Sequence, residues 1–215
     1  MLFRLPAEVL VLLLPSLLFA LSFHEFAHAY MAYKLGDETA ARMGRLTINP
    51  IAHIDPMGAL MILFVGFGWA KPVPVNSMNL RNPRTDMMKV AFAGPASNLL
   101  LALAGGIIIR FMGFQTYYGL MVAGVIPQLL AFFVQINIML AVFNMIPIPP
   151  LDGSQIFAGI IARKNPDLAY KIQMHGPKVL MGVILLGMLT NIHILSWIIT
   201  PFLKVFMYLF AGISF

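Results

Sequence analysis

The sequence predicts an all-α membrane protein, a bundle of about five to six transmembrane helices with a short re-entrant or β-hairpin element after the first helix. Two observations predict this fold class. Only 10% of the 215 residues are charged, whereas soluble domains carry about 25%. In addition, 60% of the residues are hydrophobic and the mean hydropathy is +0.87. So few charges cannot cover a water-facing surface, and lipid must therefore solvate most of the chain.

The first apolar run extends from about Leu5 to Tyr33 and exceeds the roughly 20 residues that cross a bilayer. It is too long for the apolar core of a cleaved signal peptide, so we expect a retained helix. A polar, turn-rich stretch follows over residues 34–56. The next apolar run, Met57 to Trp69, is too short to span comfortably and contains glycines, which predicts the re-entrant or β-hairpin element.

The remaining apolar runs predict the rest of the bundle. A second spanning helix is expected from about Met87 to Met112, and a third from about Leu120 to Met145. Residues 163–178 are expected to form a polar loop. The run from Val179 to Phe210 predicts two short helices broken around Asn191–His193, or one irregular pair.

The basic residues predict the orientation of the chain. Most of them lie in residues 34–89 and 163–178, whereas the connection near residues 110–119 holds only Arg110 and the N-terminus only Arg4. Cytoplasmic loops collect Lys and Arg, so the two basic segments are expected in the cytoplasm and the N-terminus outside. This topology explains the net charge of +6, and nucleic-acid binding is not predicted.

The motif that carries chemistry is His24-Glu25-Phe26-Ala27-His28, inside the first apolar run. Residues four apart share one face of a helix, so both imidazoles can bind one ion, and Glu25 beside them can accept a proton from an attacking water. Ionisable groups at bilayer depth cost about 2–3 kcal/mol each. A divalent metal compensates that cost, and the absence of cysteine restricts its ligands to His and carboxylate.

A third ligand must come from elsewhere in the chain, because catalytic zinc takes about three protein ligands and keeps one position open. Asp152 is the best candidate. It follows the third predicted helix, on the same predicted side as the end of the first, and Gly153 after it permits a sharp turn. Taken alone, an aspartate here is more often a turn or cap residue. The unmatched pair of histidines favours the ligand interpretation.

Two further segments give the chain a resemblance to a known family. Asn144–Gly153 reads NMIPIPPLDG, and Ala93–Asn98 reads AGPASN at the start of the second helix. Together with the histidine motif, about 125 residues before Asp152, these segments resemble the site-2 protease family of intramembrane zinc metalloproteases. The resemblance covers residues 20–160. The chain departs from the family in one respect, since we find no PDZ-like or CBS-like insert and expect a compact form.

The resemblance implies roles for individual residues. His24, His28 and Asp152 correspond to the ligands of one catalytic Zn²⁺, and Glu25 to the general base and acid. Asn144 corresponds to an asparagine that donates a hydrogen bond to the oxyanion or to the substrate backbone; its alternative role is to cap the end of the third helix.

Two further polar residues are candidates for supporting the ligands or binding substrate, His53 in the first loop and Asn98 in the second helix. Their alternatives are a hydrogen bond within the local turn for His53 and a hydrogen bond to a neighbouring helix for Asn98.

The expected function is that of a zinc metalloendopeptidase that hydrolyses membrane-spanning protein substrates, within the lipid bilayer of the cell membrane and toward its cytoplasmic side. Residues 64–76 are expected to form either an edge strand that pairs with an unwound substrate or a structural loop that packs over the core. We expect one domain over residues 1–215, with a catalytic core over about 5–160 and C-terminal helices over about 178–212. The alternatives are a divalent-metal transporter, which needs no general base, and a non-catalytic homologue that binds membrane proteins. The sequence does not define the oligomeric state.

Overall fold

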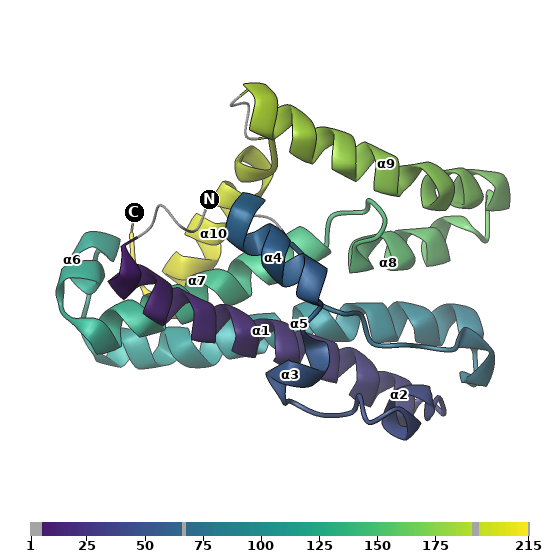
Figure 1. The fold of residues 1–215 in the computed structure, drawn as a ribbon, viewed down its shortest axis with the longest axis horizontal. Coiled ribbons are helices and arrows are strands. Elements are labelled where there is room, and N and C mark those ends of the chain that lie inside the picture. Colours follow the sequence, from purple (N-terminus) through teal and green to yellow (C-terminus); the bar gives the residue numbers. More distant parts are fainter. Residues whose placement is uncertain (1–5, 66–67, 191–193, 215) are drawn as a thin grey trace.

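The computed structural model describes residues 6–65, 68–190 and 194–214 (Figure 1). The fold class is confirmed, because this part of the chain is helical and contains no β-strand. Four helices in this part of the chain are long and apolar enough to cross a membrane, fewer than the five to six that the sequence predicted. They are α1 (Ala7–Lys34), α5 (Pro83–Phe111), α7 (Val125–Asn144) and α10 (Ile194–Ala211).

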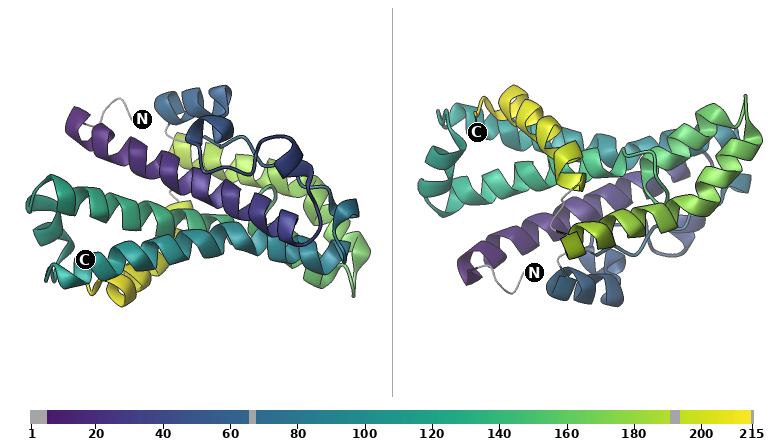
Figure 2. Two further views of the ribbon diagram at one scale, coloured as in Figure 1. Left: turned by 90° about the horizontal axis from the view of Figure 1, so that it is seen from below. Right: turned by 90° about the horizontal axis from the view of Figure 1, so that it is seen from above.

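Shorter or less apolar helices connect these four. They are α2 (Thr39–Arg42), α3 (Pro50–His53), α4 (Pro56–Val65), the 3-10 helix η2 (Ser77–Asn79), α6 (Tyr117–Val122), α8 (Asp152–Ile161) and α9 (Pro166–Thr190). Helices α1, α5 and α7 pack against one another, and α10 packs against α5 and α7 (Figure 2). Helix α8 packs against α5 and α9, which brings the segment after α7 back to the bundle.

The main hydrophobic core lies where α5, α6, α7 and α10 meet. Ile109, Val134, Ile138 and Met207 are fully buried there. Burying one such side chain contributes about 1.5–3 kcal/mol. This core involves the C-terminal half of α5, so it fixes α5 and α7 while the N-terminal half of α5 remains available for polar contacts with α1.

Two segments differ from the prediction. The expected third helix is divided into α6 and α7, because Gly124 precedes α7 with a φ of +116°, a conformation that interrupts the helix. The expected polar loop over residues 163–178 is largely helical, since α9 begins at Pro166, a residue that favours the first turn of a helix. The expected break at residues 191–193 lies outside the described residues.

The apolar run after the first loop forms a helix and not a β-hairpin. Helix α4 occupies most of it, and a single antiparallel bridge between Ile54 and Ala70 closes the excursion at its base. The backbone of Trp69 lies against Gly58 of α4, because a Cβ added to Gly58 would meet it. The described part of residues 57–69 therefore contains no strand pair, and none that could act as the edge strand expected within residues 64–76.

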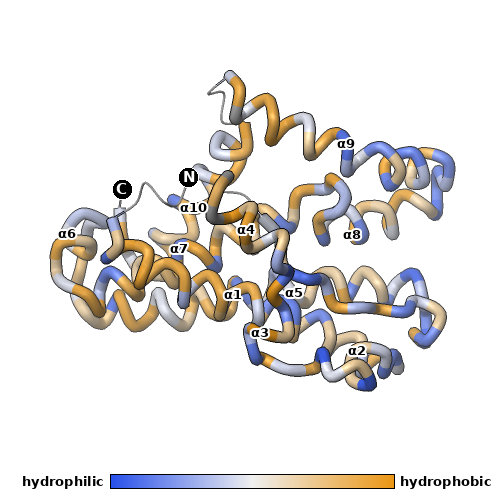
Figure 3. The backbone as a smooth tube through the Cα atoms, in the orientation of Figure 1, coloured by the Kyte–Doolittle hydropathy of each residue, from blue (hydrophilic) through white to orange (hydrophobic). Residues whose placement is uncertain are grey.

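The polar residues concentrate at one end of the molecule. Figure 3 shows hydrophilic residues around α2, the start of α5 and the turn between α8 and α9, whereas the end with α6 is mostly hydrophobic. The two basic segments of the sequence, residues 34–89 and 163–178, thus contribute to the same end. This is the arrangement that a membrane protein with both segments on one side requires.

Asp37 fixes the chain directly after α1. Its carboxylate accepts hydrogen bonds from the hydroxyl of Thr39, the backbone N–H of Asn76 and the amide of Asn79. Burial alone would raise the pKa of Asp37, but these hydrogen bonds outweigh it and lower the pKa. The ionised carboxylate therefore joins the end of α1 to the segment that precedes α5.

Candidate active site

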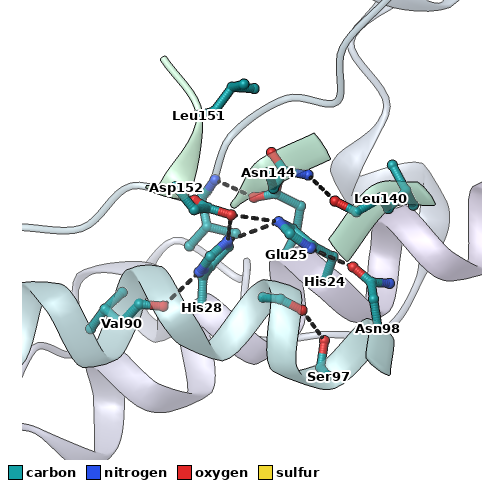
Figure 4. Close-up of polar contacts among 12 residues, drawn as sticks. His24, Glu25, His28, Val90, Ser97, Asn98, Leu140, Asn144, Leu151 and Asp152 are labelled. Carbon is teal, nitrogen blue, oxygen red and sulfur yellow. Dashed lines mark hydrogen bonds and ion pairs between the residues drawn. The ribbon is translucent and has the colours of Figure 1, made fainter. Parts of the chain in front are cut away.

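His24 and His28 face each other one turn apart on α1. Their ring centroids are 4.6 Å apart, and their Nε2 atoms are separated by 3.0 Å. Both residues are buried. The spacing predicted from the sequence therefore places both imidazoles at one point, as Figure 4 shows.

Asp152 brings a carboxylate to the same point from a different part of the fold. It is the first residue of α8, and its Oδ2 lies 3.1 Å from Nε2 of His24 and 3.3 Å from Nε2 of His28 (Figure 4). An acidic residue in the first turn of a helix is stabilised by the helix dipole. Asp152 is thus held at the cluster as a carboxylate.

The other ring nitrogens determine the tautomers of both histidines. Nδ1 of His24 donates to Oδ1 of Asn98 at 2.6 Å, and Nδ1 of His28 donates to the carbonyl of Val90 at 2.8 Å. The orientation of the Asn98 amide follows from its Nδ2, which donates to the carbonyl of Ala20 and to Oδ1 of Asn137. Each histidine therefore carries a proton on Nδ1, which leaves Nε2 as the nitrogen available to bind a cation.

Nε2 of both histidines and Oδ2 of Asp152 consequently converge on one point. Oδ2 of Asp152 is buried, and its polar neighbours at this point are the two Nε2 atoms. When both Nε2 atoms are unprotonated, as metal binding requires, three lone pairs face one another, and a cation between them relieves the repulsion. Ligands at about 2.0–2.1 Å from a tetrahedral zinc ion lie about 3.3 Å apart, close to the separations of 3.0, 3.1 and 3.3 Å among the three atoms. His24, His28 and Asp152 thus fit a zinc ion.

Gly94 on α5 leaves the space that the two imidazoles occupy. A Cβ at this position would lie 2.5 Å from Cε1 of His28 and 2.6 Å from Cε1 of His24. Carbon atoms in contact are normally about 3.5–4.0 Å apart. The site therefore needs a residue without a side chain here.

Comparison with known proteins gives the family. The sequence profile described as Peptidase family M50 matches residues 105–190. YwhC of Bacillus subtilis is 42% identical over 159 residues, which cover 73% of this chain and 72% of that protein. The chain belongs to peptidase family M50.

Other relatives are similar over a smaller share of their length. Rip2 of Mycobacterium tuberculosis is 33% identical over 68% of this chain and 56% of its own length. MJ0392 of Methanocaldococcus jannaschii is 23% identical over 83% of this chain and 43% of its own length. All three relatives have the words zinc metalloprotease in their names. No solved structure gave a significant match.

Glu25 lies beside the group formed by His24, His28 and Asp152. Its Oε2 accepts a hydrogen bond of 2.9 Å from the backbone N–H of Val73. Asn144 ends α7, and its Nδ2 donates to the carbonyl of Leu140 at 3.0 Å, as a residue that caps the helix end would. Figure 4 shows Glu25 and Asn144 with the three ligand residues.

The structure separates the two remaining candidates. Asn98 bonds to His24 and also to Asn137 on α7, so it both orients the His24 ring and joins helices. His53 is buried in the loop, where its Nε2 bonds to the carbonyl of Thr47 at 2.7 Å and its Nδ1 lies 3.4 Å from Arg45. His53 is outside the ligand group that the structure brings together.

Sequence reasoning missed three contributors to the M50 site, Val90, Gly94 and Val73. Val90 and Val73 act through backbone atoms, so their side chains carry no signal. Gly94 stood in a segment already singled out, but its role depends on how closely α5 approaches α1.

Proposed function

We propose that this chain is an intramembrane zinc metalloprotease that hydrolyses peptide bonds of membrane-spanning protein substrates. One observation carries the proposal. Nε2 of His24, Nε2 of His28 and Oδ2 of Asp152 converge beside a carboxylate, Glu25, inside an apolar bundle. Membership of family M50 supports the same reaction class.

The residues divide the chemistry among them. His24, His28 and Asp152 would hold a zinc ion, which would lower the pKa of a bound water toward about 7 and polarise a carbonyl group. Glu25 accepts the proton of the attacking water and delivers it to the leaving amine. The carbonyl of Val90 and the amide of Asn98 hold the histidines in the tautomer that ligation needs.

Asn144 is the proposed donor to the oxyanion or to the substrate backbone. Its Nδ2 carries two hydrogens, and one of them bonds to the carbonyl of Leu140. The second amide hydrogen is therefore left for substrate. A donor aimed at the developing charge contributes about 10²–10³ in rate.

The site lies nearer one membrane face than the other. His24 is ten residues from the end of α1, which corresponds to about 15 Å along the helix axis. That end of α1 leads into the basic segment of residues 34–89. Because cytoplasmic loops collect Lys and Arg, we place the active site toward the cytoplasmic side.

Helix α4 is the proposed re-entrant element. Its ten residues are about 15 Å long, half a bilayer, and none is charged. Met57, Leu60 and Phe64 on α4 are exposed to the surroundings of the chain. We further propose one domain over residues 1–215, with the catalytic core over about 5–160 and helices over about 178–212 at its C-terminal side.

The decisive test compares Glu25→Gln with Glu8→Gln in proteoliposomes that contain a single-pass substrate. Glu8 is an exposed glutamate at the other end of α1 and serves as the matched control. We expect Glu25→Gln to keep one zinc per chain and to lose cleavage by about 10²-fold or more, because general acid–base catalysis contributes about 10²–10⁴. Full cleavage by Glu25→Gln would exclude the mechanism.

The topology is tested with single cysteines, since the chain contains none of its own. A cysteine at Ile48 should react with a membrane-impermeant maleimide only in inside-out vesicles, and one at Gly113 only from the opposite side. A cysteine at Leu60 on α4 should be protected from both sides. Labelling of Leu60→Cys from water at the rate of Ile48→Cys would show that α4 does not enter the bilayer.

A further inference from the structure

The segment from Lys71 to Asn76 has no regular secondary structure and contacts Glu25 of the candidate active site. Its sequence, KPVPVN, places prolines on both sides of Val73. Proline has no N–H and restricts φ, so Val73 is the only backbone donor within residues 72–74. That donor bonds to Oε2 of Glu25 at 2.9 Å.

One end of this segment is fixed by the loop that contains His53. The N–H of Lys71 donates to the carbonyl of His53 at 2.9 Å, and Nη2 of Arg45 donates to the carbonyl of Lys71 at 2.8 Å. Arg45 and His53 are both buried. His53 thus helps to fix the start of the segment and lies outside the group of His24, His28 and Asp152.

The other end is fixed by Asp37, directly after α1. Oδ2 of Asp37 accepts the N–H of Asn76 at 2.7 Å. Between the two ends, Val75 packs against the adjoining apolar cluster of Ala32, Leu80 and Val90. The segment is thus attached to α1 near both Glu25 and Asp37, and it cannot move away as a free loop.

We propose that Val73 is a positioning residue, whose backbone N–H holds Glu25 in the orientation that accepts a proton from the attacking water. The inference rests on the proposed role of Glu25. A glutamate side chain has several rotamers, and fixing it costs conformational entropy in each turnover unless the protein has already done so. The bond occupies Oε2 and leaves Oε1 for the proton.

Two other interpretations of the bond between Val73 and Glu25 predict different effects on the rate of cleavage. If the segment were a latch that blocks Glu25, removing the Val73 N–H would raise the rate of cleavage. If it only stabilised the fold, removing the N–H would reduce zinc content and thermal stability together with activity. A positioning role lowers kcat alone.

The test uses the full chain in proteoliposomes with a single-pass substrate. Val73→Pro removes the N–H, and Val73→Ala keeps it while removing most of the side chain. We expect Val73→Pro to lower kcat by about 10-fold or more, the loss typical of a hydrogen bond to a charged group, with KM and zinc content within about twofold of the parent. Val73→Ala should remain within about twofold in kcat.

A second variant guards against misfolding of Val73→Pro. Replacing residue 73 by the hydroxy acid analogue of valine exchanges the N–H for an ester oxygen and keeps the side chain. It should show the same loss of kcat. Unchanged or raised kcat in the ester variant overturns the proposal, as does an equal loss in Val73→Ala. Glu25→Gln in the same assay separates the two proposals, because an active Glu25→Gln contradicts the mechanism itself.

Discussion

Gly94→Ala is the most direct perturbation of the metal site that leaves every ligand in place. The added methyl group would lie 2.5–2.6 Å from the Cε1 atoms of His28 and His24. Normal carbon contacts are about 3.5–4.0 Å, so the groups must separate by about 1 Å. The imidazoles cannot simply withdraw, because Val90 and Asn98 on the same helix hold their Nδ1 atoms.

The cost follows from the way a packed site responds to extra volume. Inserting a methyl group into such a site costs about 1–3 kcal/mol. If that strain falls on the zinc-bound arrangement, zinc affinity decreases about 5-fold to 150-fold, since 1.4 kcal/mol corresponds to a factor of ten. Alanine also favours helix over glycine by about 0.5–1 kcal/mol, which must be measured separately.

Gly182→Ala supplies that measurement. Gly182 lies within α9, and a Cβ there would meet nothing within 4 Å. Zinc affinity is measured by competition with a chelator, and thermal stability is followed in parallel. We expect weaker zinc binding in Gly94→Ala and unchanged zinc binding in Gly182→Ala. A folded Gly94→Ala that binds zinc as the parent does would refute the close approach of α5 to the histidines.

Three further predictions follow from the same contacts. Asn98→Leu removes the acceptor for Nδ1 of His24 and should lower zinc affinity or cleavage about 10–100-fold, measured by chelator competition and by substrate cleavage. Removing zinc with a chelator should abolish cleavage and lower the melting temperature. Re-adding zinc to 100 times its Kd should raise the free energy of unfolding by about 2.7 kcal/mol. Because the pKa of Asp37 is lowered in the folded protein, its stabilisation is complete above the unfolded pKa of about 3.9 and is lost as the pH falls through the lower folded pKa. Asp37→Asn should therefore lower the melting temperature at pH 7, and the difference from the parent should narrow below about pH 4.

The sequence predicted what depends on composition and on helical spacing. The apolar runs located α1 and α5 to within a few residues, and the four-residue spacing of His24 and His28 correctly placed both rings at one point. Asp152 reached the same point through a proline-rich segment whose path no periodicity encodes. Its assignment depended on the unmatched histidines and on the family resemblance.

The remaining differences arise where tertiary context decides the backbone. The run over residues 57–69 contains glycines that suit a hairpin, yet α4 forms there with no charged residue to interrupt it. Residues 163–178 looked like a loop because they are basic, but charge does not prevent helix formation, and α9 starts at Pro166. Both expectations used polarity and turn residues as evidence about the backbone conformation, although these features restrict that conformation only weakly.

The register between α1 and α5 explains why the site depends on residues that carry no chemistry. Val90, Gly94 and Asn98 are spaced four apart, so they form one stripe on α5 opposite the stripe of His24 and His28 on α1. The stripe presents in turn a carbonyl acceptor, a gap and an amide. A shift of α5 by a single residue in register would bring a side chain into the gap and remove the Asn98 amide from Nδ1 of His24. The two helices thus set the tautomers and the spacing of the histidines before Asp152 or a metal ion contributes.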